Sequence, residues 1–274
     1  MYLAACVQLH SNADVERNVA EAERLVRRAA GYGASLVATP ECTVYLGPWD
    51  ERARIAQPVD GPIARHFSAL ATSLGIHLLI GSFPERTLRA DGSPDPERSY
   101  NTSLLFGPNG RLLATYRKIH LFDVDVKGGP RLQESRTTVA GERVVTCDTA
   151  LGMLGLSICY DLRFPELYRA LVDAGAQLIT IPAAFTLDTG KDHWHALVRA
   201  RAIETQCWVM APGQWGRHGD RGIRRSYGHS MIVDPWGAVV AECGDGEGIC
   251  LAEIRRDRVG SVRKGMPLAQ HRKL

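Results

Sequence analysis

Cys159 stands where a strand pattern gives way to a helix pattern. The apolar run 154–158 reads as a buried strand, and a polar stretch with Pro165 separates it from an apolar pattern of helical spacing. Proline suits the first turn of a helix, where its missing N–H costs nothing. A corner of this kind lifts a side chain above a sheet and points free backbone N–H groups at the group it attacks. The position is therefore typical of a nucleophile.

A thiol alone is a poor catalyst, because only a small fraction of an ordinary thiol is ionised at neutral pH. It needs a base and a positive neighbour, and two other segments supply candidates. Glu41 follows the short apolar strand 36–38, and Lys118 follows the strand 112–116. Read separately, the three residues could be an inert buried thiol, a capping or surface carboxylate and a solvated ammonium. Together they form a coherent set of nucleophile, base and electrophile.

Three segments, in this order along the chain, resemble the nitrilase superfamily of carbon–nitrogen hydrolases: 40–42 (PEC), 116–123 (YRKIHLFD) and 158–166 (ICYDLRFPE). Further similarity extends from Cys6 to Arg272, so the resemblance covers nearly the whole chain. That family uses a Glu–Lys–Cys triad, which implies catalytic roles for Glu41, Lys118 and Cys159. Glu134 stands where many members carry a second glutamate that positions the substrate and the lysine.

The resemblance implies hydrolysis through a thioester. Glu41 would take the thiol proton, pass a proton to the departing amine and later activate water. Lys118 and the backbone N–H of Tyr160 would stabilise the tetrahedral oxyanion, where losing one donor typically costs roughly 3–4 kcal/mol. This mechanism requires no metal and no organic cofactor, and the expected partner is a small-molecule amide.

The residues after the cysteine favour an amide over a nitrile. Members that act on nitriles usually carry Trp–Glu there, whereas amidase branches often carry the Tyr160–Asp161 seen here. Segments 202–207, 226–231 and 233–237 are similar to the branch that hydrolyses deaminated glutathione to 2-oxoglutarate and cysteinylglycine. The omega-amidase branch, which cleaves 2-oxoglutaramate, has a similar lysine segment. Hydrolysis of N-carbamoyl compounds or a nitrile, and a non-catalytic scaffold, remain alternatives.

Both 2-oxo acid amides present a carboxylate, which requires a cationic or N–H-rich pocket. Arg163, Arg199 and Arg201 are available, and Arg163 is the candidate nearest to the cysteine in sequence. Phe185 and Trp194 are candidates for the pocket wall, with core packing an equal alternative.

The composition is that of an ordinary globular protein, with 274 residues, 45% hydrophobic, 23% charged and a net charge of +3. Interspersed charges give no reason to expect nucleic acid, and the basic runs 221–225 and 255–264 are expected to be solvated faces. No stretch approaches a transmembrane span, and residues 1–7 read as a first strand rather than a signal peptide. We therefore expect no membrane partner.

Seven singly spaced cysteines, an odd number, favour a reducing compartment and hence a cytoplasmic protein. The sequence contains no recognisable zinc motif. For His193 and His195, which flank Trp194, a packed or polar helix face is favoured over a metal site.

Apolar residues at spacings of four and three predict a helix over 15–29, and a second helix opens at Gly61–Pro62. Hairpin signals at 108–110 and 234–237 each close a run of strands and helices. Two such α/β halves predict two packed sheets with helices outside. The segment 86–99, rich in Arg, Pro, Asp and Ser, is predicted to be a mobile surface loop.

The family resemblance implies that these layers form a four-layer α-β-β-α sandwich in a single domain, 1–274. It also implies a homodimer paired through the helical layers.

Overall fold

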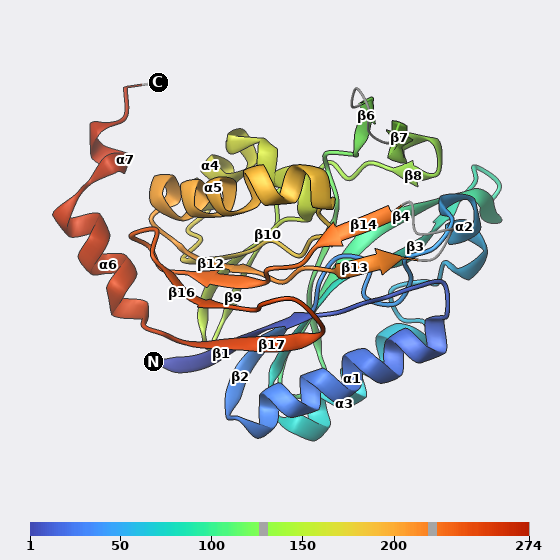
Figure 1. The fold of residues 1–274 in the computed structure, drawn as a ribbon, viewed down its shortest axis with the longest axis horizontal. Coiled ribbons are helices and arrows are strands. Elements are labelled where there is room, and N and C mark those ends of the chain that lie inside the picture. The colour runs from blue at the N-terminus through green and yellow to red at the C-terminus, as the bar shows by residue number, and fades with distance from the viewer. Residues whose placement is uncertain (126–130, 219–223, 274) are drawn as a thin grey trace.

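Two β-sheets lie face to face in the computed structural model, and helices cover the outer side of each (Figure 1). The structure describes residues 1–125, 131–218 and 224–273. The predicted α-β-β-α sandwich is confirmed. No helix in the described part of the chain is long and apolar enough to cross a membrane.

The first sheet is built from the N-terminal half of the chain and closed by a late strand. Its order is β17-β1-β2-β3-β4-β5, with β8 also paired to β4. The pairs β1–β2 and β2–β3 are parallel, whereas β17–β1, β3–β4 and β4–β5 are antiparallel. The strands are β1 (Tyr2–Gln8), β2 (Ala34–Ala38), β3 (His77–Leu88), β4 (Pro94–Phe106), β5 (Leu112–Arg117), β8 (Thr138–Val139) and β17 (Gly248–Ile254).

Helices α1 (Val15–Gly31) and α3 (Pro62–Leu74) cover the outer face of this sheet (Figure 1), which confirms both predicted helices. Asp14 caps α1 by accepting the backbone N–H of Arg17 at 3.0 Å. Gly75 ends α3 in the left-handed region, with φ of +65°, where glycine carries no Cβ penalty. The short helices η1 (Trp49–Glu51) and α2 (Arg52–Ile55) connect β2 to α3.

The second sheet comes from the C-terminal half and has the order β16-β15-β12-β11-β10-β9. Helices α4 (Pro165–Asp173) and α5 (Leu187–Thr205) cover its outer face (Figure 1). The strands are β9 (Thr146–Thr149), β10 (Gly152–Leu156), β11 (Leu178–Thr180), β12 (Trp208–Ala211), β15 (Met231–Val233) and β16 (Val239–Glu242). Helices α6 (Arg256–Gly265) and α7 (Leu268–His271) follow β17 at the C-terminal end.

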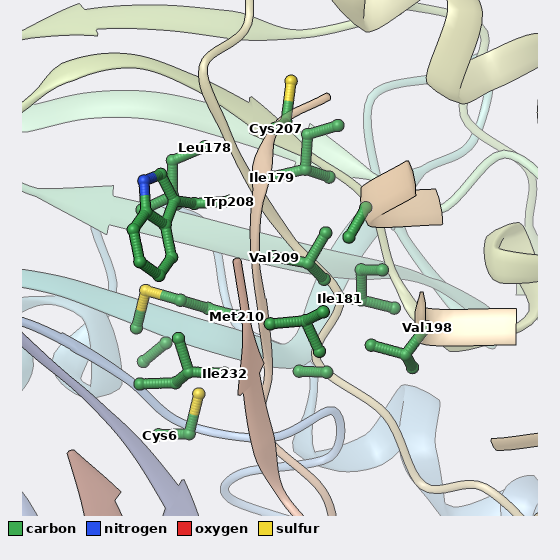
Figure 2. Close-up of a cluster of buried hydrophobic side chains, with 14 of the residues drawn as sticks. Cys6, Leu178, Ile179, Ile181, Val198, Cys207, Trp208, Val209, Met210 and Ile232 are labelled. Carbon is green, nitrogen blue, oxygen red and sulfur yellow. The ribbon is translucent and has the colours of Figure 1, made fainter. Parts of the chain in front are cut away.

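Buried apolar side chains join the two sheets. Figure 2 shows side chains of β11 and β12, among them Ile179 and Met210, packed with Val198 of α5 and with Cys6 of the first sheet. A second cluster lies between the first sheet and the helices α1 and α3. Each fully buried Leu, Ile or Val side chain stabilises the fold by about 1.5–3 kcal/mol relative to an exposed one. The core therefore holds the edges of the two sheets in a fixed relation.

The prediction of a loop over 86–99 is wrong. The strands β3 and β4 continue past the sheet as a two-stranded ribbon, in which Arg86 pairs with Ser99 and Leu88 with Pro94. Gly92, with φ of +83°, lies in the turn between them. Most side chains of the ribbon are exposed, so its composition is that of a surface loop although its backbone is paired.

Smaller elements lie around the edge where the two sheets meet. They are two ribbons, β6 (Asp123–Asp125) with β7 (Arg131–Gln133) and β13 (Trp215–His218) with β14 (Arg224–Tyr227), and two single-turn helices, η2 (Glu134–Arg136) and η3 (Cys159–Arg163). Of the basic run 221–225, residues 221–223 lie outside the described part of the chain.

Candidate active site

Cys159 follows β10 at the start of η3, and its backbone has a φ of +49°. A residue other than glycine in this region carries a strain of order 1–3 kcal/mol, which the surroundings must hold in place. The backbone N–H of Cys159 donates to the carbonyl of Pro182 at 2.9 Å. The residue is 8% exposed. The predicted strand-to-helix corner is thus present, and it presents the sulfur at the edge of the second sheet.

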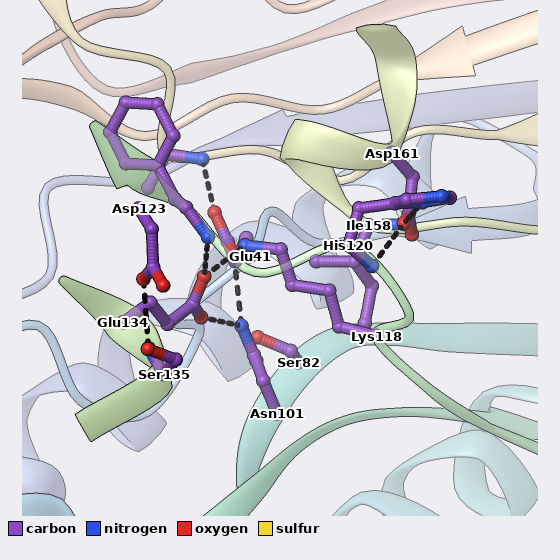
Figure 3. Close-up of polar contacts among 12 residues, drawn as sticks. Glu41, Ser82, Asn101, Lys118, His120, Asp123, Glu134, Ser135, Ile158 and Asp161 are labelled. Carbon is purple, nitrogen blue, oxygen red and sulfur yellow. Dashed lines mark hydrogen bonds and ion pairs between the residues drawn. The ribbon is translucent and has the colours of Figure 1, made fainter. Parts of the chain in front are cut away.

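The buried carboxylate of Asp161 holds this corner (Figure 3). Its Oδ2 accepts the backbone N–H of Ile158 at 2.8 Å and the hydroxyl of Tyr116 at 2.6 Å. Its Oδ1 accepts the backbone N–H of His120 at 3.0 Å and lies 2.7 Å from Nδ1 of the same residue. Tyr116 and His120 flank Lys118, so one carboxylate ties the cysteine corner to the lysine segment.

Lys118 projects from the end of β5 into a buried cluster (Figure 3). Its Nζ lies 2.9 Å from Oε1 of Glu41 and 2.8 Å from Oε2 of Glu134. Burial lowers the pKa of Lys118, but the charges of Glu134 and Glu41 outweigh this and hold the pKa well above its usual value. The side chain is therefore a fixed ammonium ion.

Glu41 receives hydrogen bonds from both sheets. Its Oε1 accepts Nζ of Lys118 and Nδ2 of Asn101, each at 2.9 Å. Its Oε2 accepts the backbone N–H of Ala184, which follows β11, at 2.9 Å. The residue is only 4% exposed. It is consequently held in one orientation beside the thiol.

Glu134 lies on η2 and is the second carboxylate in contact with Lys118. Its Oε2 accepts the backbone N–H of Phe122 at 2.8 Å, and its Oε1 accepts Nδ2 of Asn101 at 3.2 Å. Nη1 of Arg52 lies 3.7 Å from the same Oε1. Burial raises the pKa of Glu134, but Lys118 and Arg52 lower it further, so the net shift is downward. The residue is an anion that positions the lysine.

The thiol of Cys159 is protonated at rest. Burial, the charge of Glu41 and a hydrogen bond with Glu41 raise its pKa well above the usual value, and Lys118 offsets only part of this rise. A protonated thiol hydrogen-bonded to Glu41 can pass its proton to that side chain at the moment of attack.

A pocket of about 580 Å³, including its open mouth, lies over these groups. Glu41, Lys118, Glu134 and Cys159 form its floor. Aromatic side chains and arginines make up much of its wall: Trp49, Phe122, Tyr160, Phe185, Arg52, Arg163 and Arg224. Four cations against two carboxylates give the pocket a net positive lining, which favours an anionic ligand.

Of the other predicted site residues, some line the pocket and some do not. Arg163 and Phe185 both line the pocket, and the guanidinium carbon of Arg163 lies 5.1 Å from the centre of the Phe185 ring. Trp194 lies behind Phe185, with ring centres 5.2 Å apart, and its Nε1 donates to the carbonyl of His229 at 2.8 Å. It supports the wall from the core and does not line the pocket.

Arg199 and Arg201 point elsewhere. Nε of Arg199 donates to the carbonyl of Gly237 at 2.8 Å. Arg201 is buried, donates to the carbonyl of Leu162 at 2.9 Å and forms an ion pair with Glu204. Among the three arginines considered from sequence, Arg163 alone lies in the pocket.

Sequence reasoning missed Asn101, Arg52 and Arg224. Asn101 is buried in β4 and bridges Glu41 and Glu134. In the sequence, its only signal was its position shortly before the apolar run 104–106. Arg52 lies in a run of charged residues that reads as solvent-exposed, yet it is 3% exposed. Arg224 was expected on a solvated face; it lines the pocket, with its guanidinium carbon 4.8 Å from the centre of the Trp49 ring.

Metal-ligating side chains also gather outside the pocket, where His195, His229 and Glu242 lie close together. His193 does not join them, since its Nδ1 lies 3.3 Å from the guanidinium of Arg163.

The chain as a whole is similar to known proteins. A family model described as carbon-nitrogen hydrolase matches residues 3–264. A deaminated glutathione amidase of Synechocystis sp. is 44% identical over 273 residues, which cover 99% of this chain and 98% of the relative.

Two solved structures share the fold. The Caenorhabditis elegans NitFhit protein has a TM-score of 0.90 and 40% identity, with 99% of this chain and 65% of that chain covered. Saccharomyces cerevisiae Nit3, a member of branch 10 of the nitrilase superfamily, has a TM-score of 0.86 and 35% identity, with 100% and 97% covered.

Proposed function

The chain belongs to the carbon–nitrogen hydrolase family and is an amidase, and we propose that its substrate is deaminated glutathione. The reaction releases 2-oxoglutarate and cysteinylglycine. The observation that carries the proposal is the cationic pocket above Cys159, because this substrate presents a carboxylate at each end. The name of the Synechocystis relative supports the same substrate.

The proposed acylation uses the four residues at the pocket floor. Glu41 takes the proton from the Cys159 thiol as the sulfur attacks the amide carbon. The oxyanion forms against the ammonium of Lys118 and the backbone N–H of Tyr160, in the first turn of η3, where N–H groups lack helical partners. Glu134 holds the lysine in place. The C–N bond then breaks, Glu41 gives its proton to the leaving amine, and a thioester remains.

Deacylation repeats the sequence with water. The amine leaves, a water molecule takes its place, and Glu41 removes a proton from that water as the oxygen attacks the thioester carbon. The same oxyanion donors stabilise the second tetrahedral intermediate. Its collapse breaks the C–S bond, returns the proton to the sulfur and releases the acid. In the proposed mechanism, Glu41 accepts or donates the proton in every proton transfer.

The amide bond that is cleaved divides the substrate into an acyl half and a leaving half, and the pocket offers an arginine to each. We assign Arg163, next to Phe185 and close to the cysteine corner, to the carboxylate of the 2-oxo acid. Arg224, beside Trp49, is suited to the carboxylate of the leaving cysteinylglycine. Deaminated glutathione would place a charged dipeptide leaving group there, whereas the leaving group of 2-oxoglutaramate is ammonia and would not use Arg224.

The experiment measures 2-oxoglutarate release from both amides, coupled to glutamate dehydrogenase. We expect kcat/KM to be about 100-fold higher for deaminated glutathione, equivalent to about 2.7 kcal/mol of transition-state stabilisation. The reverse preference would identify an omega-amidase. Turnover of neither substrate would leave the amidase chemistry in place and move the search to acyl-amides and N-carbamoyl compounds.

Two variants keep that experiment interpretable. Cys159→Ala should abolish turnover and retain the fold, whereas equal activity in this variant would refute the mechanism and favour a scaffold. Cys147→Ala is the matched control, because Cys147 is the most exposed thiol and does not line the pocket. It should retain full activity.

We also propose a homodimer paired through the helical layers, with the whole chain, 1–274, as its repeating domain. Ile203 of α5 is 47% exposed and Trp236, in the turn between β15 and β16, is 56% exposed. Ile203 packs against Gly237, so the two exposed side chains belong to one patch. Analytical ultracentrifugation of the wild type and of Trp236→Arg tests this pairing.

The proposed location is the cytoplasm. All seven cysteines lie in the described residues and are free, which supports a reducing compartment.

A further inference from the structure

Three metal-ligating side chains converge outside the catalytic pocket, from three separate elements. His195 lies on α5, His229 lies between β14 and β15, and Glu242 ends β16. Oε1 of Glu242 lies 2.8 Å from Nε2 of His195 and 2.7 Å from Nδ1 of His229. The three ligand atoms all lie within 4.8 Å of one another. None of these residues lines the catalytic pocket.

The backbone at this cluster is firmly held. His229 has a φ of +54°, a conformation that residues other than glycine rarely adopt. Its carbonyl accepts Nε1 of Trp194, the residue before His195 on α5, at 2.8 Å. The ring of Tyr227 stacks on the His229 ring, with centres 4.4 Å apart. The two imidazoles are thus fixed relative to each other by α5 and by the chain before β15.

We propose that His195, His229 and Glu242 form a binding site for a divalent transition-metal ion, with Zn²⁺ as the expected occupant. Two imidazole nitrogens and one carboxylate oxygen are a common protein ligand set for zinc, and water completes the tetrahedron. Bonds of about 2.0 Å place tetrahedral ligands roughly 3.3 Å apart. The two Glu242–histidine separations, 2.8 and 2.7 Å, are shorter than this value, and all three ligand atoms lie within 4.8 Å of one another, so binding an ion requires small side-chain movements.

A further carboxylate stands where an outer partner of a zinc ligand is expected. Nε2 of His229 lies 3.9 Å from Oδ1 of Asp245, on the side of the ring opposite Glu242. The same Oδ1 accepts Nε1 of Trp215 at 3.4 Å. A carboxylate at the second ring nitrogen orients a metal-bound histidine and strengthens its donor atom. Asp245 is positioned to do this for His229.

The ligand types determine which ion binds. Imidazole nitrogens favour Zn²⁺, Ni²⁺ and Cu²⁺, whereas Mg²⁺ prefers an all-oxygen shell and retains its water. The side chains are between 27% and 37% exposed, so an ion can reach them from solvent. A bound ion would join α5 to the hairpin of β15 and β16 and would stabilise the folded protein by mass action.

The test titrates Zn²⁺ into the metal-free wild type by isothermal calorimetry, with Mg²⁺ as the comparison ion. We expect one zinc site, no magnesium site, and a zinc-dependent rise in Tm. His195→Gln and Glu242→Gln should each weaken zinc binding by at least about tenfold. Both variants should melt like the wild type without metal, which shows that they fold.

Two further variants identify the site. Zinc binding should persist in Cys159→Ala, and its loss there would assign the ion to the catalytic thiol and overturn the proposal. His66→Gln is the matched control, because His66 pairs with Glu23 at 2.9 Å on the surface and no third ligand joins them in the described residues. His66→Gln should bind zinc as the wild type does. Equal affinity in the wild type and His195→Gln, or no binding by the wild type, would also refute the site.

Discussion

The carboxylate of Glu41 crosses from one sheet to the other and accepts the backbone N–H of Ala184 at 2.9 Å. Glu41 follows β2 of the first sheet, whereas Ala184 and Cys159, the proposed nucleophile, follow strands of the second. Glu41 is therefore oriented in part by the half of the molecule that carries Cys159, its proton donor in the proposed mechanism. This contact makes the alignment of the reacting groups depend on how the two sheets pack.

Asn101→Ala is expected to lower kcat. The amide Nδ2 donates to Glu41 and Glu134, so its loss leaves two buried carboxylates short of a donor, at about 1.5–3 kcal/mol for a hydrogen bond to a charged group. This corresponds to a roughly ten- to hundredfold drop in kcat, with little change in KM. Steady-state kinetics measure it, with the exposed-turn variant Asn109→Ala as control. An unchanged kcat would show that Asn101 only fills space.

Arg163→Met is expected to separate charged from neutral substrates. Without the guanidinium, kcat/KM for 2-oxoglutaramate should fall roughly ten- to hundredfold through KM, because a charge-assisted hydrogen bond is lost. Butyramide, which has no carboxylate, should be affected much less. Arg199→Met serves as control, since Arg199 bonds the carbonyl of Gly237 outside the pocket. Equal losses for both amides would argue against carboxylate recognition by Arg163.

Asp161→Asn is expected to destabilise the fold by about 2–4 kcal/mol. The buried carboxylate accepts hydrogen bonds on both oxygens, and an amide must turn an N–H₂ group toward some of those donors. Urea denaturation measures the change, and Asp148→Asn, at an exposed carboxylate, should leave the free energy of unfolding nearly unchanged. A loss below about 0.5 kcal/mol in Asp161→Asn would refute the role of this carboxylate in holding the cysteine corner to the lysine segment.

Alkylation of Cys159 by iodoacetamide should still accelerate at pH 9. Its pKa is raised, chiefly by burial and by Glu41, so the thiolate fraction at any given pH is smaller than for an ordinary thiol with a pKa of about 8.5. Glu41→Gln removes one of these causes and should shift the rate profile to lower pH. Mass spectrometry of the Cys159 peptide measures the rate. A plateau below pH 8 in the wild type would contradict the raised pKa.

The free energy of unfolding should fall as the pH drops from 6.5 toward 4. Burial lowers the pKa of His218 to about 4, while its Nδ1 donates to the carbonyl of Ser11 at 2.8 Å. Between these pH values the unfolded chain binds a proton that the folded chain does not, so stability rises with pH. The contribution of His218 reaches about 3 kcal/mol. Urea denaturation should show a flatter pH dependence in His218→Gln, and equal slopes would refute the assignment.

The sequence predicted the elements and residues that local pattern can reveal. Glu41, Lys118 and Cys159 each follow an apolar strand and lie in a recognisable motif, and the structure brings them together at one edge of the sandwich. The helices over 15–29 and from Pro62 were confirmed because their apolar stripes are regular. These features depend on neighbours within a few residues along the chain.

The features that were missed depend on distant contacts. Arg52 reads as a surface charge, and only its packing against Glu134 and the pocket shows that it is buried. Trp194 could have lined the pocket or the core, and its bond to the carbonyl of His229 decides for the core. The polar composition of 86–99 led to the prediction of a loop, whereas the structure shows that its two strands are paired.

The division of the site between the two sheets also has a consequence for biosynthesis. A ribosome that has completed β5 has made Glu41 and Lys118 but not yet Cys159, the proposed nucleophile. The thiol is made later, and it meets Glu41, its proposed base, only after the second sheet has docked. A nascent chain therefore cannot attack cellular amides, and the onset of turnover during refolding reports the docking of the two halves directly.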